Sequence, residues 1–161
     1  MAAYGYKEVS EESVSAVTAT PSVSLGSRQA EGGREYIYAY NGGSAANKGA
    51  PVILTATSGY TFVVTFATAA DTPCNLLGVV NNATCAAGSY CWVATRGNVG
   101  VYVISMAVAA SDALIVADAG GSARVATATS SLTQLVKQGF IGNALSTQTA
   151  AATGVVSVYL R

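Results

Sequence analysis

The side chains that most often carry out catalysis or hold metal ions are scarce in this chain. It has no histidine, eight acidic residues and eight basic residues among 161. A serine or cysteine nucleophile activated by histidine is therefore excluded. Beyond residue 35 the acidic residues are Asp71, Asp112 and Asp118, and their spacing pairs none of them for glycoside hydrolysis. We expect no enzyme and no cofactor; chemistry based on Lys48 or Lys137 alone is the remaining catalytic alternative.

The three cysteines do not form a recognisable metal or redox motif. Cys74, Cys85 and Cys91 are separated by eleven and six positions, unlike a C-x-x-C pair or a zinc knuckle, and no histidine can complete a metal site. Nothing at the N-terminus resembles a secretory signal. We therefore predict reduced, buried thiols and no metal. A disulfide between Cys85 and Cys91 is the alternative.

One glycine-rich segment has a partial likeness to a phosphate-binding loop. Residues 42–49 read Gly-Gly-Ser-Ala-Ala-Asn-Lys-Gly, but Lys48 neither follows a glycine nor precedes Ser or Thr. We predict a hairpin loop there. A formal net charge of zero and a pI of about 6.1 also argue against nucleic acid as a partner.

The longest apolar stretch, residues 101–119, does not indicate a membrane span. It contains Asp112 and Asp118, and a carboxylate at the centre of a bilayer is costly. We predict two strands and a turn there, and no membrane partner. Only 10% of the residues are charged, against about a quarter in typical soluble domains. This favours burial of part of the surface against other chains, the alternative being a monomer with a surface of small polar residues.

Short runs of β-branched and aromatic residues recur from Tyr36 onward between Gly, Asn and Asp. Period-two alternation with turns every eight to twelve residues or so is typical of sandwiches and small barrels. The runs predicted as strands are Tyr36–Tyr40, Pro51–Ala56, Thr61–Thr68, Leu76–Val80, Tyr90–Ala94, Gly100–Met106, Ala113–Ala117, Ala123–Thr127, Gly139–Leu145 and Val155–Leu160. We predict an all-β fold, a small β-barrel, β-tulip or sandwich, over residues 35–161. Ser130–Gln138 favours a short helix.

Two of these runs carry apolar residues on both faces. They are Val99–Met106 and Val155–Leu160, and a strand of this kind is either central in a sheet or covered by a partner.

Residues 1–34 differ from the rest in composition. They contain few large apolar residues apart from Tyr4, Tyr6 and Leu25, and they end in Gly32-Gly33. We predict an extended N-terminal arm that adds to a neighbouring sheet, with Tyr4 and Tyr6 as anchors, and we expect the fold to survive its removal. A disordered tail is the alternative.

The run Tyr36–Tyr40 places its tyrosines on one face and Ile37 and Ala39 on the other. Tyr36, Tyr38 and Tyr40 combine large apolar area with a polar tip, which suits a contact surface. The alternative is the inner face of a barrel.

Several segments, in order, resemble the small head-decoration (capsid cement) proteins of tailed bacteriophages. The N-terminal segments are Ser24–Ser27 and Gly33–Tyr38, followed by the small-residue loop that ends in Lys48-Gly49. The central ones are Gly78-Val79, Ala87–Val93 and Gly97, and the closing ones are Gly139–Leu145 and Gly154–Val158. The likeness spans most of residues 24–161, and Cys91 stands where the pattern has glycine.

The resemblance implies a β-barrel or β-tulip domain, commonly a homotrimer, made in the host cytoplasm and located on the outer capsid surface of the virion. Its partner would be the major capsid protein. The alternatives are a β-rich head fibre or receptor-binding module, and a carbohydrate-binding module. The carbohydrate reading needs a solvent-facing platform, for which the tyrosines of residues 36–40 with Trp92 are the candidates.

Overall fold

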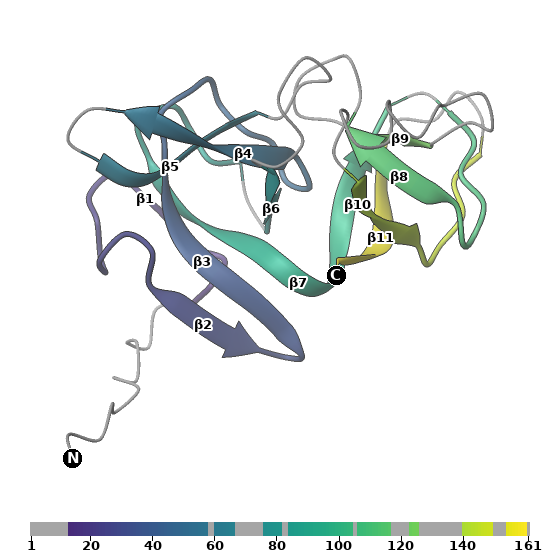
Figure 1. Ribbon diagram of the computed structural model, residues 1–161, viewed down its shortest axis with the longest axis horizontal. Helices are drawn as coiled ribbons and strands as arrows, with labels where there is room; N and C mark the ends of the chain where they lie inside the picture. The colour runs from purple at the N-terminus through teal and green to yellow at the C-terminus, as the bar shows by residue number, and fades with distance from the viewer. Residues whose placement is uncertain are drawn as a thin grey trace.

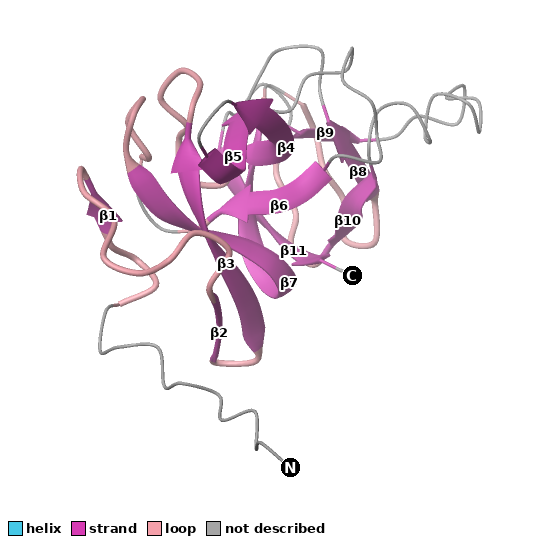
Figure 2. Ribbon diagram, turned by 60° about the vertical axis from the view of Figure 1, so that its left-hand side comes forward, coloured by secondary structure: helices cyan, strands magenta, loops and turns pink. Residues whose placement is uncertain are grey.

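The structure of this chain is a computed structural model that describes residues 13–57, 60–66, 76–81, 84–104, 106–116, 123–125, 140–149 and 154–160. All regular secondary structure in these residues is β (Figures 1 and 2). The strands are β1 (Val17–Thr18), β2 (Arg28–Glu31), β3 (Arg34–Asn41), β4 (Pro51–Thr57), β5 (Tyr60–Phe66), β6 (Leu76–Val80), β7 (Tyr90–Val103), β8 (Ala113–Val116), β9 (Ala123–Val125), β10 (Phe140–Ala144) and β11 (Gly154–Leu160). The all-β prediction is confirmed. The helix predicted over Ser130–Gln138 lies outside the described residues.

The strands form one open, mostly antiparallel sheet. Its order is β11-β10-β8-β9-β7-β6-β4-β5-β3-β2, with β1 paired to β7 and additional pairings β11–β7 and β7–β3. The pairings β3–β5 and β7–β9 are parallel. A closed barrel, tulip or sandwich is not established by this open sheet.

The long strand β7 belongs to both halves of the molecule (Figure 1). Its first part pairs with β3, from Tyr40↔Tyr90 to Glu35↔Arg96, and its second part pairs with β11 from Gly97 to Val103. The sequence predicted two separate strands here, Tyr90–Ala94 and Gly100–Met106. Gly97 has a φ of 98°, and a Cβ there would lie 2.6 Å from the Gly33 carbonyl oxygen. Glycine at position 97 therefore allows β7 to continue as one strand while its pairing partner changes from β3 to β11.

Strand β3 is buried on both faces. Ile37 and Ala39 pack into a cluster with Val52 and Val93. Residues on the other face of β3 pack into a second, larger cluster that extends through the second part of β7 to β8, β10 and β11. Alternation thus sends two sets of side chains into two apolar interiors.

Residues 13–34 contain two strands of the sheet, β1 and β2, and this corrects the prediction of an arm that pairs with a neighbouring chain. Val17 pairs with Cys91 on β7, β2 pairs along its whole length with β3, and the Val14 side chain is buried. Apolar anchors and backbone pairing hold this segment to its own chain, so residue 34 is not a boundary between arm and domain. Residues 1–12, with Tyr4 and Tyr6, lie outside the described residues.

Two predictions about turns have different outcomes. Residues 42–50 form a loop, but not a hairpin, because β3 and β4 are not paired with each other. The stretch 101–119 contains the end of β7 and all of β8, with a turn between them in which the Asp112 carboxylate accepts a hydrogen bond from the Ala109 N–H at 2.8 Å. In this second case the predicted strands and turn are confirmed.

Candidate interaction surfaces

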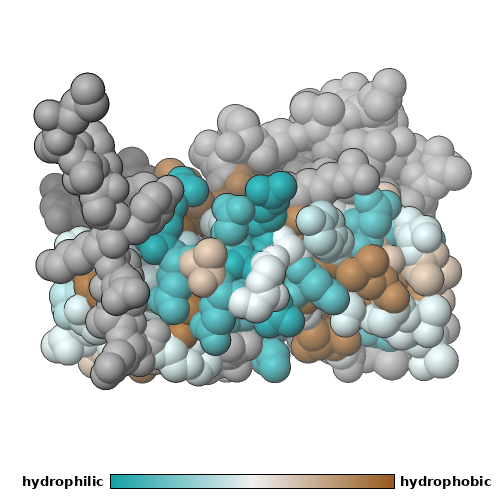
Figure 3. All heavy atoms as spheres, turned by 90° about the horizontal axis from the view of Figure 1, so that it is seen from below, coloured by the Kyte–Doolittle hydropathy of each residue, from teal (hydrophilic) through white to brown (hydrophobic). Residues whose placement is uncertain are grey.

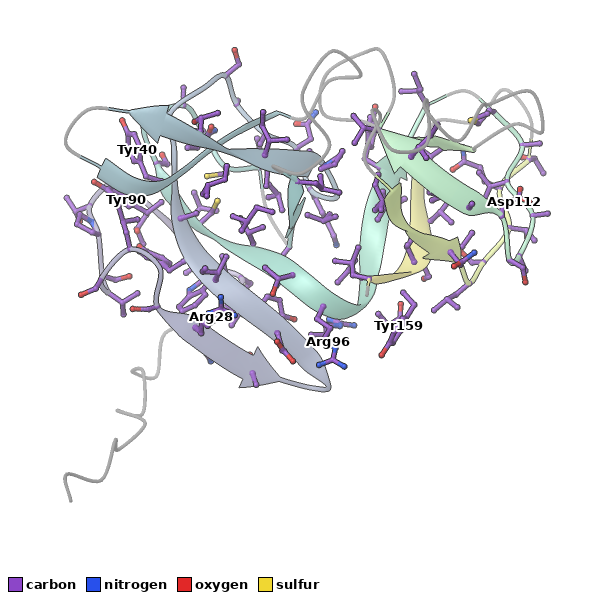
Figure 4. All side chains as sticks on the ribbon, viewed as in Figure 1. Arg28, Tyr40, Tyr90, Arg96, Asp112 and Tyr159 are labelled. Carbon is purple, nitrogen blue, oxygen red and sulfur yellow. The ribbon has the colours of Figure 1, made fainter. Side chains whose placement is uncertain are left out.

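The tyrosines of β3 contribute to an internal aromatic cluster. Tyr36 and Tyr38 are buried, whereas Tyr40 is half-buried. The ring of Tyr38 lies 5.0 Å from that of Trp92 and is stacked on that of Tyr90 at 6.1 Å. Tyr40 in turn contacts Tyr90 at 5.1 Å, at the end of the sheet marked in Figure 4. Tyr36 and Tyr38 therefore do not form an exposed contact surface, because both are buried in the chain's own core.

The aromatic face is covered by the chain's own residues 13–27, which we call the strap. The Tyr38 hydroxyl contacts the Thr18 hydroxyl at 3.0 Å and accepts hydrogen bonds from the Ser22 hydroxyl at 3.0 Å and the Ser22 N–H at 3.3 Å. The backbone continues the β2–β3 pairing, since the Tyr38 N–H donates to the Ser27 carbonyl at 2.9 Å. Of the rings proposed as a carbohydrate platform, Tyr36, Tyr38 and Trp92 are buried and Tyr40 is half-buried.

Large apolar side chains are exposed on the opposite half of the molecule. Leu145, Val155 and Tyr159 are 50%, 49% and 45% exposed. Val155 and Tyr159 point outward from β11 while the alternate residues of that strand are buried. Ser157 lies between Val155 and Tyr159 on the same face of β11. The Leu145 N–H donates to the Ser157 carbonyl at 2.7 Å, so Leu145 lies beside Ser157. We call these three residues the outer patch; Tyr159 is labelled in Figure 4.

One face of the molecule has polar and apolar parts. Figure 3 shows polar atoms at the centre of one face and a group of apolar atoms toward the half that contains β8–β11. On the polar side, Arg96 and Glu35 form an ion pair at 3.2 Å, with side chains 63% and 48% exposed. An exposed pair of this kind contributes little to stability. The apolar part is the better candidate for a lasting contact.

The sequence contained the signal for the outer patch. Apolar residues on both faces of Val155–Leu160 required that strand to be either central or covered by a partner. In the structure one face is buried by the chain and the other, with Val155 and Tyr159, is exposed. Sequence reasoning missed the patch because it gave more weight to the tyrosines of β3.

The described cysteines are free and buried, as predicted. A hydrogen bond with the Cys91 side chain lowers the pKa of Cys85, although burial opposes the shift. The same hydrogen bond, together with burial, raises the pKa of Cys91. Cys74 lies outside the described residues. Among the described residues, no group of three or more His, Cys, Asp or Glu is placed to hold a metal ion.

A search of the described part of the chain finds no helix with the length and apolar character needed to cross a membrane. No protein-family model matches the chain, and no curated protein matches it significantly.

Proposed function

We propose that this chain is a virion structural protein, a capsid decoration or cement protein that binds the outer surface of a major capsid protein lattice and stabilises the mature head. The observation that carries the proposal is the outer patch, because large apolar side chains there are half exposed in a chain with only 10% charged residues. The resemblance of residues 24–161 to head-decoration proteins of tailed bacteriophages supports the same role.

The size of the outer patch favours action in several copies. Covering a Leu, Val or Tyr side chain that is about half exposed contributes roughly 1 kcal/mol, so one patch contributes about 3–4 kcal/mol before the costs of association. That corresponds to a dissociation constant in the millimolar range at best. Presenting several patches together raises the overall affinity without new contacts. This supports a homo-oligomer, and the resemblance favours a trimer.

Stabilisation of the shell then follows from linkage. A subunit that contacts more than one capsid protein in the expanded lattice, and fewer in the unexpanded one, adds its binding free energy to the expanded state alone. The protein performs no chemistry in this mechanism. Residues 1–12, with Tyr4 and Tyr6, supply a second proposed contact with the capsid surface.

The finer fold that we propose is a pair of small barrels or tulips. The β7–β3 pairing returns the first group of strands to β7, and the β11–β7 pairing returns the second group. Both pairings support curvature of the strands around the buried clusters, the larger of which is shared by the two groups.

The proposal is tested first by the copy number of the chain in purified virions. We expect a number comparable to that of the major capsid protein. A few copies per particle would favour the head-fibre or receptor-binding alternative, and absence from the virion would overturn the proposal. Binding of the isolated chain to a glycan array would favour the carbohydrate-binding alternative.

A sedimentation assay with expanded capsids locates the contact. The double variant Val155→Ser with Tyr159→Ser should reduce co-sedimentation at least tenfold. Leu54→Ser is the matched control, because Leu54 is also an exposed large apolar residue, at 38%, but lies on β4 in the other half. Undiminished binding of the double variant would place the contact elsewhere.

A further inference from the structure

The two described cysteines come from segments that the fold holds firmly together. Cys85 forms an isolated antiparallel bridge with Ala46, in which each N–H donates to the other's carbonyl at 2.8 Å. The Asn41 side chain adds a hydrogen bond to the Cys85 carbonyl at 2.9 Å. Cys91 lies on β7, where it pairs with Ala39 on one side. Backbone pairing therefore fixes the positions of both residues.

The two thiols are neighbours inside the first half of the molecule. Both belong to the buried cluster that contains Ile37 and Val93, and the Cys85 thiol lies 3.8 Å from the carbonyl oxygen of Ser89, two residues before Cys91. A disulfide requires about 2.05 Å between the sulfurs and about 3.5–4.5 Å between the Cβ atoms. The two buried thiols must move into this geometry for the bond to form.

We propose that Cys85 and Cys91 form a reversible, oxidation-dependent cross-link that fastens the loop of residues 84–89 to β7. The oxidant is a peroxide. The Cys85 thiolate attacks one oxygen of hydrogen peroxide, the O–O bond breaks, and hydroxide leaves and takes up a proton to give water. The Cys91 sulfur then attacks the sulfenic sulfur of Cys85, the S–S bond forms, and the S–O bond breaks as a second water leaves. Two thiols and one peroxide thus become one disulfide and two waters.

Cys85 is the residue that reacts first. Its pKa is lowered by the hydrogen bond from Cys91, so the thiolate, which is the reactive form, is more populated at Cys85. Its thiol also lies 3.8 Å from the Ser89 carbonyl, within its own loop. Because both thiols are buried, oxidation requires an opening of this loop and proceeds slowly.

The cross-link stabilises the folded state by restricting the unfolded chain. It closes a short ring between residues 85 and 91, and the loop-entropy relation predicts a rise in Tm of about 5–9 °C for a chain of this size. Cys91 also pairs with Val17 of β1, so the bond lies next to the point where the strap joins β7. Oxidation should therefore slow exchange of the strap as well.

The full-length chain with Cys74→Ala isolates this pair from the third thiol. After treatment with hydrogen peroxide we expect the intact mass to fall by two hydrogens, a peptide linking Cys85 to Cys91, a Tm higher by about 5–9 °C, and full reversal by dithiothreitol. Cys85→Ala and Cys91→Ala in the same background are controls that should lose the cross-link and the Tm shift. Repeating the oxidation in urea below the unfolding transition gives the peroxide access to the buried thiols.

Addition of oxygen atoms without loss of two hydrogens would overturn the proposal. Cross-links between chains, or a lower Tm on oxidation, would also overturn it. Failure to form the bond even in urea would do the same. None of these outcomes depends on capsid binding, so they are separate from the test of the proposed function.

Discussion

Replacing Tyr38 with phenylalanine tests whether one phenol oxygen holds the strap over the aromatic face. That oxygen has contacts at 3.0 Å to the Thr18 and Ser22 hydroxyls and a longer one, at 3.3 Å, to the Ser22 N–H. The Tyr38 side chain is fully buried and phenylalanine keeps the shape of the ring, so packing changes little. Two short hydrogen bonds at ~1 kcal/mol each predict a loss of about 2 kcal/mol in the free energy of unfolding. For a chain of this size the expected fall in Tm is about 4–8 °C.

Urea unfolding and hydrogen exchange together check this prediction. Tyr38→Phe should lower the urea midpoint and speed exchange in residues 13–27 more than elsewhere. Tyr159→Phe is the matched control: its ring is 45% exposed, and its stability should stay within about 0.5 kcal/mol of wild type. A loss below about 0.5 kcal/mol in Tyr38→Phe, or unchanged exchange in the strap, would refute the reasoning.

Three further substitutions or truncations follow from the same contacts. Gly97→Ala should lower the free energy of unfolding by at least about 2 kcal/mol in a thermal melt, because a Cβ there would lie 2.6 Å from the Gly33 carbonyl oxygen. In the control Gly32→Ala the new Cβ meets nothing within 4 Å, so only the positive φ should cost stability, by about 1 kcal/mol. Equal losses in the two variants would contradict this. Gln29→Met should raise the free energy of unfolding by about 1 kcal/mol, because the buried Oε1 of Gln29 has no hydrogen-bond partner. A lower urea midpoint in this variant would instead reveal a partner for that oxygen. A chain that starts at Gly33 loses β2, the strap and buried Val14, and should melt well below one that starts at Ser13, which keeps every described contact; similar melting temperatures would restore the independent arm.

Local sequence pattern was sufficient for most of the strands. Period-two alternation placed β3, β4, β6, β8 and β11 within a few residues of their observed bounds. It failed at β2, where Arg28–Glu31 is a polar run that becomes a strand only because β3 supplies a partner. The pattern also failed at Gly97, where it predicted a break between two strands but β7 continues. A sequence does not show whether a glycine lies in a turn or within a continuous strand.

The candidate surface was harder to predict than the fold. Alternation shows that Tyr36 and Tyr38 share a face, but it does not show whether another segment covers that face. The strap supplies the cover through Val14 and Thr18, and these are common residue types in a segment that reads as a polar tail. In contrast, Tyr159 has no cover among the described residues, and only tertiary structure separates the two cases.

The sharing of β7 between two halves has a consequence during protein synthesis. Val103 pairs with Gly154, roughly fifty residues later, so at about 5–20 residues per second the second part of β7 waits for seconds before β11 is made. In that interval Val99, Val101 and Val103 form an unpaired apolar edge of the kind that recruits strands from other nascent chains. Gly97 and Gly100 interrupt this edge and lower its tendency to pair. In the folded protein Gly100 also leaves the space for Val155, since a Cβ there would lie 2.5 Å from Val155 Cγ1. Gly100, which admits the correct partner, therefore also discourages wrong partners before β11 is made.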